Sequence, residues 1–558
     1  THPASPQLLA TSGDDVTVSW SNVANPSPKD WIAVWSADNS SYVAWLYTGV
    51  DVHASTLAAS HHQAHTLYNM RLDGGFHFFY MPASATVHTD PPLLVSPNVT
   101  FRLGDDEPVH VHLALTEKPS TMRVSWTSGR PGAPAVVKFG SSPTALNHAA
   151  AGSSETYTEG DLCEAPTSSE DGSWISPGFL HTVVVDVSAF APGSTVYYSV
   201  GANAVFSNTF SFVVPTVPGA SPTAAGTFLV YADQGNEREW CTECTAINRQ
   251  DYGPGSLSLI QRTAAAVADG AVFDFALHVG DLSYARNTAW KWDVWGHTIE
   301  PLASRVPLHV SIGNHEYDHL GGGTGKDPSG PAAGDTGFHP AWGNQGDDSG
   351  GECGVPVFHR FKQPATGNSV FWYGFGSRSV WNIVLSMEHS VEVGSPQREW
   401  FEAALASVNR TQFPWLFVST HRPLYCSQYS PSDTVVGQHN ADQLEPLLYK
   451  YNVDAVFAGH YHSYERTCPL LNGTCRGTPS SPAATTHITI GTAGIAMGAS
   501  PWTTQPWSVF HSNTIYAFGR VDIHNATDMT FTLIDSTNGT VLDHLNLHST
   551  HTFPTLSN

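Results

Sequence analysis

Side chains that can bind metal ions stand in five short clusters between residues 233 and 462, each after an apolar stretch. The clusters are Asp233; Asp281 with Tyr284; Asn314 with His315; His421 with Arg422; and His460 with His462. One histidine after an apolar stretch is usually a structural residue, but five clusters of metal-competent types do not arise by chance. Carboxylates, imidazoles and an amide in this number suit two metal ions about 3.5–4 Å apart, which stabilise both the attacking and the leaving oxygen in a displacement at phosphorus.

The apolar stretches before the clusters are typical of buried β-strands in an α/β layered domain. They are Thr227–Tyr231, Phe273–Val279, Leu308–Ile312, Trp381–Leu385, Trp415–Ser419 and Ala455–Phe457. Helices are predicted between them at Leu257–Ala268, Pro396–Ser407 and Asp442–Tyr451, the second with Ser395 as its N-cap. Because ligands bind at the carboxyl ends of such strands, we expect the five clusters to meet at the same edge of one sheet.

Glycines accompany four of the clusters and predict tight turns after the strands. They are Gly235, Gly280, Gly313 and Gly459. Without a Cβ, each lets the backbone turn sharply without a clash. Residues Gly321–Gly351, rich in glycine and aspartate, are predicted to form a long surface loop near the site.

The first part of the chain has a different pattern, with short alternating strands separated by turn residues and no helical period. Examples are Val16–Trp20, Trp31–Trp35, Met122–Trp126, Ala135–Phe139, Thr182–Asp186 and Thr195–Ser199. This spacing indicates two β-sandwiches, and the segment Pro215–Pro222 has the composition of a linker. We therefore expect β-sandwich domains at residues 1–96 and 97–217, an α/β domain at 224–545 and a C-terminal tail at 546–558.

The composition excludes several classes of function. The chain has 558 residues, of which 13% are charged, and 48 acidic against 24 basic residues give a net charge of −24. This balance argues against nucleic acid as a partner, and no apolar run is long enough for a membrane span. Protonation of all 29 histidines would turn −24 into about +5, so the charge pattern suggests a protein that works in mild acid.

Cysteines and glycosylation sequons indicate a secretory route. Cys468 and Cys475 bracket a short loop and Cys241 and Cys244 form a C-x-x-C, so both pairs are candidate disulfides among seven cysteines. The six N-x-[ST] sequons are at Asn39, Asn98, Asn409, Asn472, Asn525 and Asn538. Together with a first residue, Thr1, that suggests removal of a signal peptide, they favour a glycoprotein that is secreted or sent to a lysosome or vacuole.

The complete motif set resembles the purple acid phosphatases of the binuclear metallophosphoesterase superfamily, over about residues 224–545. Two details select this family: the first motif reads Asp233-Gln-Gly235, where most of the superfamily has D-x-H, and Tyr284 follows Asp281 by three residues. The run His462-Ser-Tyr-Glu-Arg466 and the closing Gly491-Thr-Ala-Gly494 also resemble the family. The resemblance implies that the second sandwich is fibronectin-III-like and that the extra first sandwich marks a long form.

The family's ligands, carried over by motif, imply a ferric ion on Asp233, Asp281, Tyr284 and His462. A divalent ion would take Asn314, His421 and His460, with Asp281 bridging both. The chemistry of the side chains agrees, because carboxylates and a phenolate suit Fe³⁺, whereas imidazoles and an amide suit Zn²⁺, Mn²⁺ or Fe²⁺.

The resemblance implies a secreted acid phosphatase that hydrolyses monoesters of small phosphorylated substrates by attack of a metal-bound hydroxide. His315 is the expected proton donor to the leaving oxygen, or else a residue that only orients a neighbour, and Glu316 is expected to fix neighbouring groups. Asn314, His315 and Arg422 are the candidate substrate contacts. Smaller plant members hold phosphate with a histidine pair that is absent here from the stretch Ser430 to Thr434. Arg422, or alternatively His439, is the expected substitute for that pair. Alternatives are a nucleotide pyrophosphatase/phosphodiesterase, a phytase, or a secreted glycoprotein without catalysis.

Overall fold

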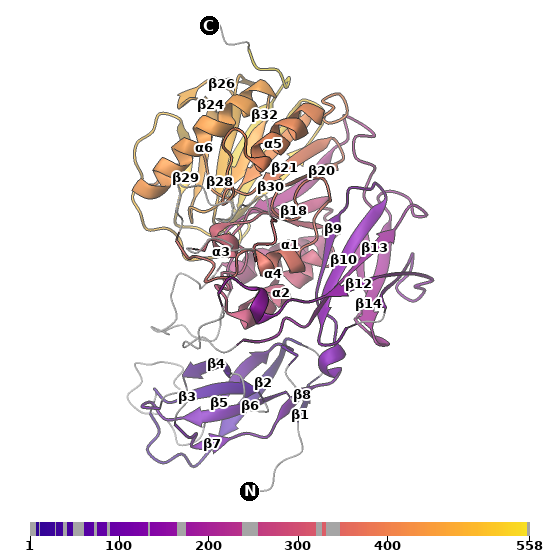
Figure 1. Ribbon diagram of the computed structural model, residues 1–558, viewed down its shortest axis with the longest axis vertical. Helices are drawn as coiled ribbons and strands as arrows, with labels where there is room; N and C mark the ends of the chain where they lie inside the picture. The colour runs from indigo at the N-terminus through magenta and orange to yellow at the C-terminus, as the bar shows by residue number, and fades with distance from the viewer. Residues whose placement is uncertain are drawn as a thin grey trace.

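The chain forms three parts that follow one another along the sequence (Figure 1). The computed structural model describes residues 7–9, 12–27, 29–36, 42–47, 61–71, 75–85, 90–131, 134–164, 174–236, 255–319, 326–330 and 346–554. We call the parts the first β domain (residues 7–101), the second β domain (109–213) and the α/β domain (226–554). Within these described residues, no helix has both the length and the apolar composition needed to span a bilayer.

The first β domain is smaller than the other two and extends beyond its predicted end. Its strands are β1 (Gln7–Leu9), β2 (Asp14–Trp20), β3 (Trp31–Ser36), β4 (Tyr42–Tyr47), β5 (His61–Leu67), β6 (Phe76–Met81), β7 (Leu94–Val95) and β8 (Val99–Phe101). One sheet has the order β1-β8-β6-β3-β4, and β2 pairs with β5. Because β8 pairs with β1 in parallel, this sheet needs residues 99–101, and the expected boundary at residue 96 falls too early.

The second β domain is a sandwich in which one strand changes sheet. Its strands are β9 (Val109–Leu115), β10 (Thr121–Ser128), β11 (Ala135–Gly140), β12 (His148–Glu155), β13 (Phe179–Asp186), β14 (Thr195–Ala202), β15 (Val205–Phe206) and β16 (Phe210–Val213). The first residues of β12 pair with β11 and its last three pair with β13. On β13, buried Val183 and Val185 alternate with exposed Val184, so the period of two seen in the sequence places one face in the core.

The α/β domain contains two large sheets. The strands are β17 (Gly226–Tyr231), β18 (Phe275–His278), β19 (Leu308–Val310), β20 (Tyr373–Ser377), β21 (Val380–Leu385), β22 (Trp415–Thr420), β23 (Ala455–Ala458), β24 (Tyr464–Leu471), β25 (Thr474–Cys475), β26 (Gly477–Thr478), β27 (Ser481–Pro482), β28 (Thr485–Ile490), β29 (Ser508–Ser512), β30 (Ala517–Ile523), β31 (Asp528–Asp535) and β32 (Val541–His548). The sheets have the orders β19-β18-β17-β30-β31-β32 and β20-β21-β22-β23-β28-β24-β25.

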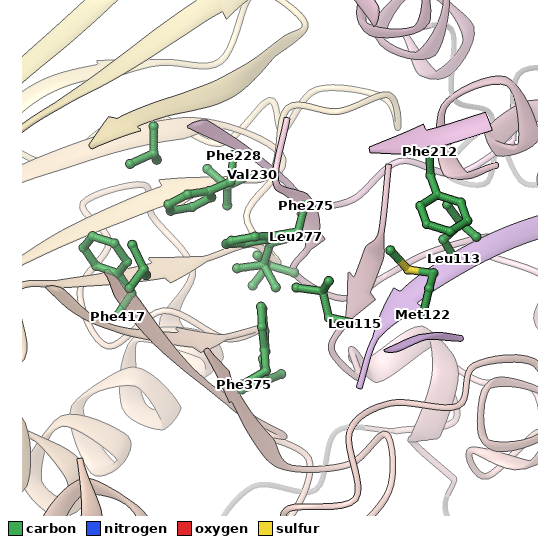
Figure 2. Packing of buried hydrophobic residues seen from close by; sticks show 14 of the residues in the cluster. Leu113, Leu115, Met122, Phe212, Phe228, Val230, Phe275, Leu277, Phe375 and Phe417 are labelled. Atoms are coloured by element: carbon green, nitrogen blue, oxygen red, sulfur yellow. The ribbon is translucent and has the colours of Figure 1, made fainter. Parts of the chain in front are cut away.

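Aromatic residues between the two sheets form their common core. The ring of Phe228 on β17 is 5.8 Å from that of Phe417 on β22 and 6.2 Å from that of Phe457 on β23. Figure 2 shows this core together with residues of the second β domain such as Leu115 and Met122, which belong to the same buried cluster. The second β domain therefore packs directly against the α/β domain.

The helices lie outside the sheets and differ in part from the prediction. They are α1 (Ser256–Ala268), α2 (Ala289–Ala303), α3 (Asn314–Tyr317), α4 (Val355–Arg360), α5 (Pro396–Ser407) and α6 (Pro431–Lys450). Helix α5 matches its prediction, and Ser395 caps it by accepting a hydrogen bond from the Arg398 N–H at 3.3 Å. Helix α6 begins eleven residues earlier than predicted, with Pro431 in its first turn, and α2 was not predicted.

Residues 546–554, which were expected to belong to a C-terminal tail, are part of the α/β domain. Strand β32 pairs with β31 as far as His548, three residues beyond the expected end at 545. After it, Ser549 Oγ donates a hydrogen bond to the buried Asp454 carboxylate, and His551 Nδ1 is 2.7 Å from the same oxygen. These contacts hold Ser549 and His551 at the residue that precedes β23.

Candidate metal centre

Strand ends from both sheets of the α/β domain meet in two groups of metal-competent side chains. One group is Asp233, Asp281 and His462; the other is Asp281, His421 and His460; in each, the potential ligand atoms lie within 4.8 Å of one another. The parallel strands β17, β18 and β19 carry the first three clusters and the parallel strands β22 and β23 carry the other two. The prediction of one sheet edge is wrong: the carboxyl edges of two sheets packed face to face form the site.

Tyr284 and Asn314 complete the two groups. The phenol oxygen of Tyr284 lies 3.1 Å from Asp233 Oδ1, 3.0 Å from Asp281 Oδ2 and 2.9 Å from His462 Nε2. The amide oxygen of Asn314 lies 3.1 Å from His421 Nε2 and 3.0 Å from His460 Nδ1. All seven side chains expected from the sequence to be ligands therefore converge, with Asp281 common to both groups.

The backbone has a left-handed conformation at several of these residues, although this conformation is usually adopted by glycine. Asp233, Asp281, Tyr284 and His460 have φ angles of 60°, 52°, 51° and 70°. Such conformations cost energy in residues with a Cβ and concentrate at functional sites.

The neighbouring glycines serve two different purposes. Gly235 and Gly280 have positive φ angles, as predicted. At Gly313 a Cβ would lie 2.1 Å from Asp281 Oδ1, and at Gly459 it would lie 2.5 Å from Asp233 Oδ2. These two glycines are therefore required for close approach of the backbone to the site and not for a left-handed turn.

Each histidine of the centre has one ring nitrogen held by an acceptor outside it. His421 Nδ1 is 2.9 Å from the Val279 carbonyl and His462 Nδ1 is 2.9 Å from the Ala496 carbonyl. Because a carbonyl can only accept, both Nδ1 atoms carry a proton and both Nε2 atoms face the centre, where they are placed to bind a cation. This arrangement is typical of imidazole metal ligands.

His460 is held by a carboxylate on helix α6 in place of a carbonyl. Its Nε2 is 3.1 Å from Asp433 Oδ1, while its Nδ1 faces Asn314. Arg422 Nη1 also lies 3.1 Å from this Nε2, but a guanidinium can only donate. If Nδ1 binds the metal ion, the ring proton is on Nε2, and Asp433 accepts its hydrogen bond.

The charges of the centre favour bound cations. Asp233 and Asp281 are at most 1% exposed, and among the described residues no lysine or arginine pairs with either. Burial, reinforced by Asp281, raises the pKa of Asp233. Burial also opposes the charge on Asp281, but His421 and His315 hold its pKa well below the usual range. Two buried carboxylates with a phenol and no fixed positive charge are the donor set of a metal centre, so the residues fit two ions.

Glu316 fixes the loops that carry these ligands, as predicted. Its carboxylate accepts hydrogen bonds from the backbone N–H groups of Gly313, Asp281 and Leu282 at 3.0, 2.9 and 2.7 Å. One buried side chain thus holds the ends of β18 and β19 together.

His315 lies beside the ligands with one ring nitrogen free to face the site. The backbone N–H of His315 donates to Asp281 Oδ1 at 3.0 Å, and its ring centroid is 4.2 Å from that of Tyr284. Its Nδ1 is 3.1 Å from the Asp348 carbonyl and therefore carries a proton, which leaves Nε2, 3.9 Å from Asp281 Oδ2, on the side of the centre.

Arg422 does not face the centre as a substrate contact would. Its guanidinium bonds Glu388 at 2.7 and 3.1 Å and Asp318 at 3.3 Å, and the residue is 3% exposed. Three carboxylates, including Asp433, surround this one cation. The geometry therefore gives no support to the expected substrate contact and makes Arg422 a support for Asp433 and His460. The alternative, His439, lies further along α6, 3.6 Å from Glu392.

The cysteines include one disulfide that the sequence did not suggest. Cys468 and Cys475 are bonded as predicted. Cys163 of the second β domain is bonded to Cys353 of the α/β domain, 190 positions away, which no sequence spacing indicates. Cys241, Cys244 and the sequon at Asn39 lie outside the described residues, and Cys426 is a free thiol. The sequons at Asn409, Asn472 and Asn538 are exposed and those at Asn98 and Asn525 are half-buried.

Comparison with known proteins gives three family matches in chain order. The N-terminal domain of purple acid phosphatases matches residues 108–214 and the calcineurin-like phosphoesterases match residues 226–464. The C-terminal part of iron/zinc purple acid phosphatase-like proteins matches residues 484–544. The seven converging side chains all lie within the phosphoesterase match.

Whole proteins and a solved structure agree with these matches. Probable inactive purple acid phosphatase 27 of Arabidopsis thaliana is 31% identical over 97% of this chain and 88% of that protein. A nucleotide pyrophosphatase/phosphodiesterase of Hordeum vulgare is 28% identical over 62% and 88%, and Fe(3+)-Zn(2+) purple acid phosphatase 12 of A. thaliana is 29% identical over 63% and 68%. The structure of purple acid phosphatase PPD1 from yellow lupin seeds superimposes with a TM-score of 0.81 at 26% identity, covering 99% of this chain and 98% of that one. With the strand-end centre, the domain order and these likenesses in agreement, the chain belongs to the purple acid phosphatase family.

Proposed function

We propose that this protein is a binuclear metallohydrolase that cleaves phosphate monoesters. The observation that carries the proposal is the pair of ligand groups that share Asp281. Asp233, Tyr284 and His462 would hold Fe³⁺, and Asn314, His421 and His460 would hold Zn²⁺, Mn²⁺ or Fe²⁺. The Fe(3+)-Zn(2+) name of one relative supports this pair of metals.

Several similar proteins are named probable inactive purple acid phosphatases, and the donor set of this chain bears on that question. Loss of activity in such a centre is expected to follow loss of a ligand, because each ligand fixes charge and geometry. Here all seven side chains are present and lie within contact distance of one another. This completeness favours an active enzyme over a glycoprotein without catalysis.

The residues of the site can divide the work of hydrolysis between them. A pair of bound ions supplies positive charge that activates water and offsets charge on the phosphoryl oxygens. His315 Nε2 faces the same space, so a protonated His315 can hydrogen-bond phosphate and give a proton to the leaving oxygen. Tyr284 packs against the ring and limits its rotation. Because this role requires protonated His315, we expect activity to be highest at roughly pH 4–6.

The substrate class has two alternatives on the same site. The barley relative is named a nucleotide pyrophosphatase/phosphodiesterase, which supports a nucleotide substrate as the second candidate. Phytate is a narrower third candidate. The interdomain disulfide and the exposed sequons support secretion, or delivery to a lysosome or vacuole, as the route of the protein.

The proposal is tested by metal analysis followed by kinetics on four substrates: a monoester, a diester, a nucleotide pyrophosphate and phytate. We expect iron plus a second metal in equal amounts and the highest kcat/KM for the monoester. A protein without either metal would overturn the enzyme, and a preference for the pyrophosphate would replace the monoester with the second candidate.

The role of His315 has its own test on this enzyme. If His315 donates a proton, His315→Ala should lower kcat on alkyl phosphates by about 10²–10⁴ and affect activated aryl phosphates far less, since these leave without a proton. Equal losses on both substrates would leave His315 as a phosphate-binding residue only.

A further inference from the structure

A short segment outside the ligand set reaches the metal centre. Residues 346–354 follow the part of the glycine-rich insertion that lies outside the described residues, and Asp348 in this segment contacts Asn314. Asp348 Oδ2 accepts a hydrogen bond from Asn314 Nδ2 at 3.0 Å, and the Asp348 carbonyl accepts one from His315 Nδ1 at 3.1 Å. One residue therefore contacts both an expected metal ligand and the expected proton donor.

The contact with Asn314 decides which end of the amide faces the metal centre. A carboxylate only accepts hydrogen bonds, so Asp348 selects the NH₂ end of the amide. The amide oxygen is then turned to the space between His421 and His460. If the amide rotated by half a turn, its NH₂ group would face a cation and could not bind it.

The contact with His315 fixes the tautomer of the ring. Because the Asp348 carbonyl holds the proton on Nδ1, the second nitrogen of His315 faces the centre. The same segment thus sets the orientation of two functional side chains with two different groups of one residue.

The segment is itself anchored on both sides. Ser349 donates from its N–H and its hydroxyl to the Asp318 carbonyl at 3.1 and 2.6 Å. Asn287 Nδ2 donates to the carbonyls of Gly350 and Glu164 at 2.8 and 3.0 Å. The Cys163–Cys353 disulfide and a hydrogen bond from the Cys163 N–H to the Gly351 carbonyl, 2.9 Å, tie the segment to the second β domain.

We propose that Asp348 is a positioning residue for the divalent ion and for His315, and that the Cys163–Cys353 disulfide holds it in place. The inference rests on the proposed metal centre. It gives the second β domain a part in the chemistry, because that domain supplies one end of the tether.

The test compares three variants of the full-length protein by their metal binding. Asp348→Ala removes the acceptor for Asn314, Asp348→Asn keeps an oxygen there without charge, and Asp347→Ala is the matched control, because the neighbouring Asp347 contacts His319 instead. Zinc affinity is measured by equilibrium dialysis with the iron site filled, and iron content and the melting temperature of the metal-free protein are measured alongside.

We expect Asp348→Ala to weaken zinc binding by about 10–100-fold, with iron content and the metal-free melting temperature unchanged. Asp348→Asn should retain most of the zinc affinity and Asp347→Ala all of it. Equal zinc affinity in Asp348→Ala and wild type would overturn the proposal. So would a parallel loss of iron, which would indicate general disruption. If wild type binds no second metal, it is the proposed function that fails.

The tether is tested separately with Cys163→Ser/Cys353→Ser. We expect weaker zinc binding than in wild type, by a smaller factor than in Asp348→Ala, because Ser349 and Asn287 still anchor the segment. Zinc affinity equal to wild type would remove the disulfide from the proposal and leave Asp348 in it.

Discussion

The two halves of the metal centre are supported by different kinds of neighbours. In the half that would hold iron, His462 is fixed by the Ala496 carbonyl, and His421 of the other half is fixed in the same way by Val279. The remaining two ligands of the divalent half, His460 and Asn314, depend on the Asp433 and Asp348 side chains. The histidine of the iron half thus rests on the main chain, whereas two of the three ligands that only the divalent half uses rest on carboxylates from outside the sheets.

This difference predicts how each half responds to change. A carbonyl in a buried loop stays where the fold puts it, and no single substitution removes it. A carboxylate on helix α6 or on the 346–354 segment can be lost by one substitution, and metal affinity changes with it. We therefore expect the identity and affinity of the divalent metal to be the more variable property of this centre.

The substitution with the largest expected effect is the one that removes the carboxylate shared by the two halves. Asp281→Ala should abolish binding of both metals and all measurable hydrolysis, because both ligand groups include this carboxylate. The free energy of unfolding should fall by about 4 kcal/mol for each lost ion, if the free metal concentration is 1,000 times the Kd of wild type. Elemental analysis and chemical denaturation measure both effects. Chelator-treated wild type should behave in the same way; one metal retained in the variant would contradict the shared role.

A smaller change should act on the iron half alone. Tyr284→Phe removes a phenol oxygen that lies 2.9–3.1 Å from three ligand atoms and keeps the ring that packs on His315. The visible absorption of a tyrosinate–iron pair should disappear while the divalent metal remains bound. Visible spectra and metal content of the purified variant decide this, and a variant that is still coloured would remove Tyr284 from the ligands.

The corresponding change on the divalent half should be milder and leave the colour intact. Asp433→Ala removes the acceptor for the His460 ring proton, so the affinity for the divalent ion should fall by about 10–100-fold. Asp442→Ala, on the same helix and bonded only to Gln438 among the interactions described, is the control. Zinc titration of the iron-loaded proteins measures the difference; a loss of iron in Asp433→Ala would break the distinction between the halves.

What the sequence could predict follows the same division. The ligands and their strands were predictable because each strand is a short apolar run that ends in a polar cluster, as in Tyr231 to Asp233. The supporting carboxylates were not, because Asp433 and Asp348 lie in segments without periodicity and approach the ligands only through tertiary folding. The link between Cys163 and Cys353 has the same cause.

The helices show a second limit. Helix α2 carries Trp290 and Val294 in the core of the first β domain and Trp292 and Trp295 in the core of the α/β domain. Its Asp293 also bonds Arg71 at 2.7 Å. A helix that is buried on several sides has no polar stripe, so the usual helical period is absent from its sequence. The early start of α6 was missed because its first turns carry few apolar residues.

The histidine content was a poor guide to behaviour in acid. The shift from −24 to about +5 would need all 29 histidines to take up protons, and several are buried in a way that disfavours the charge. Burial lowers the pKa to about 4 in His181 and His297 and to about 3 in His309 and His487. In mild acid the unfolded chain binds protons at these residues that the folded protein does not bind. They therefore lower the stability of the fold in the pH range proposed for highest activity.

The smallest expected effect is a change in stability in acid that comes from a histidine of the second β domain and not from the metal centre. His181 lies in the core of the second β domain, with Ser128 and Ser154 hydroxyls 2.8 and 2.7 Å from its two ring nitrogens. Its pKa is about 4 in the folded protein, because burial disfavours the charge, against about 6.5 when unfolded. Between these values the unfolded chain binds more protons, so the stabilisation is complete above pH 6.5 and is lost as the pH falls towards 4. From pH 7 to pH 5 this group should cost about 2 kcal/mol, and His181→Gln, which cannot titrate, should lack that part of the loss. Urea unfolding of both metal-free proteins at the two pH values measures it. If wild type and variant lose the same stability, acid does not act through this histidine, and the other buried histidines and the ligands of the two halves become the places to look for its effect.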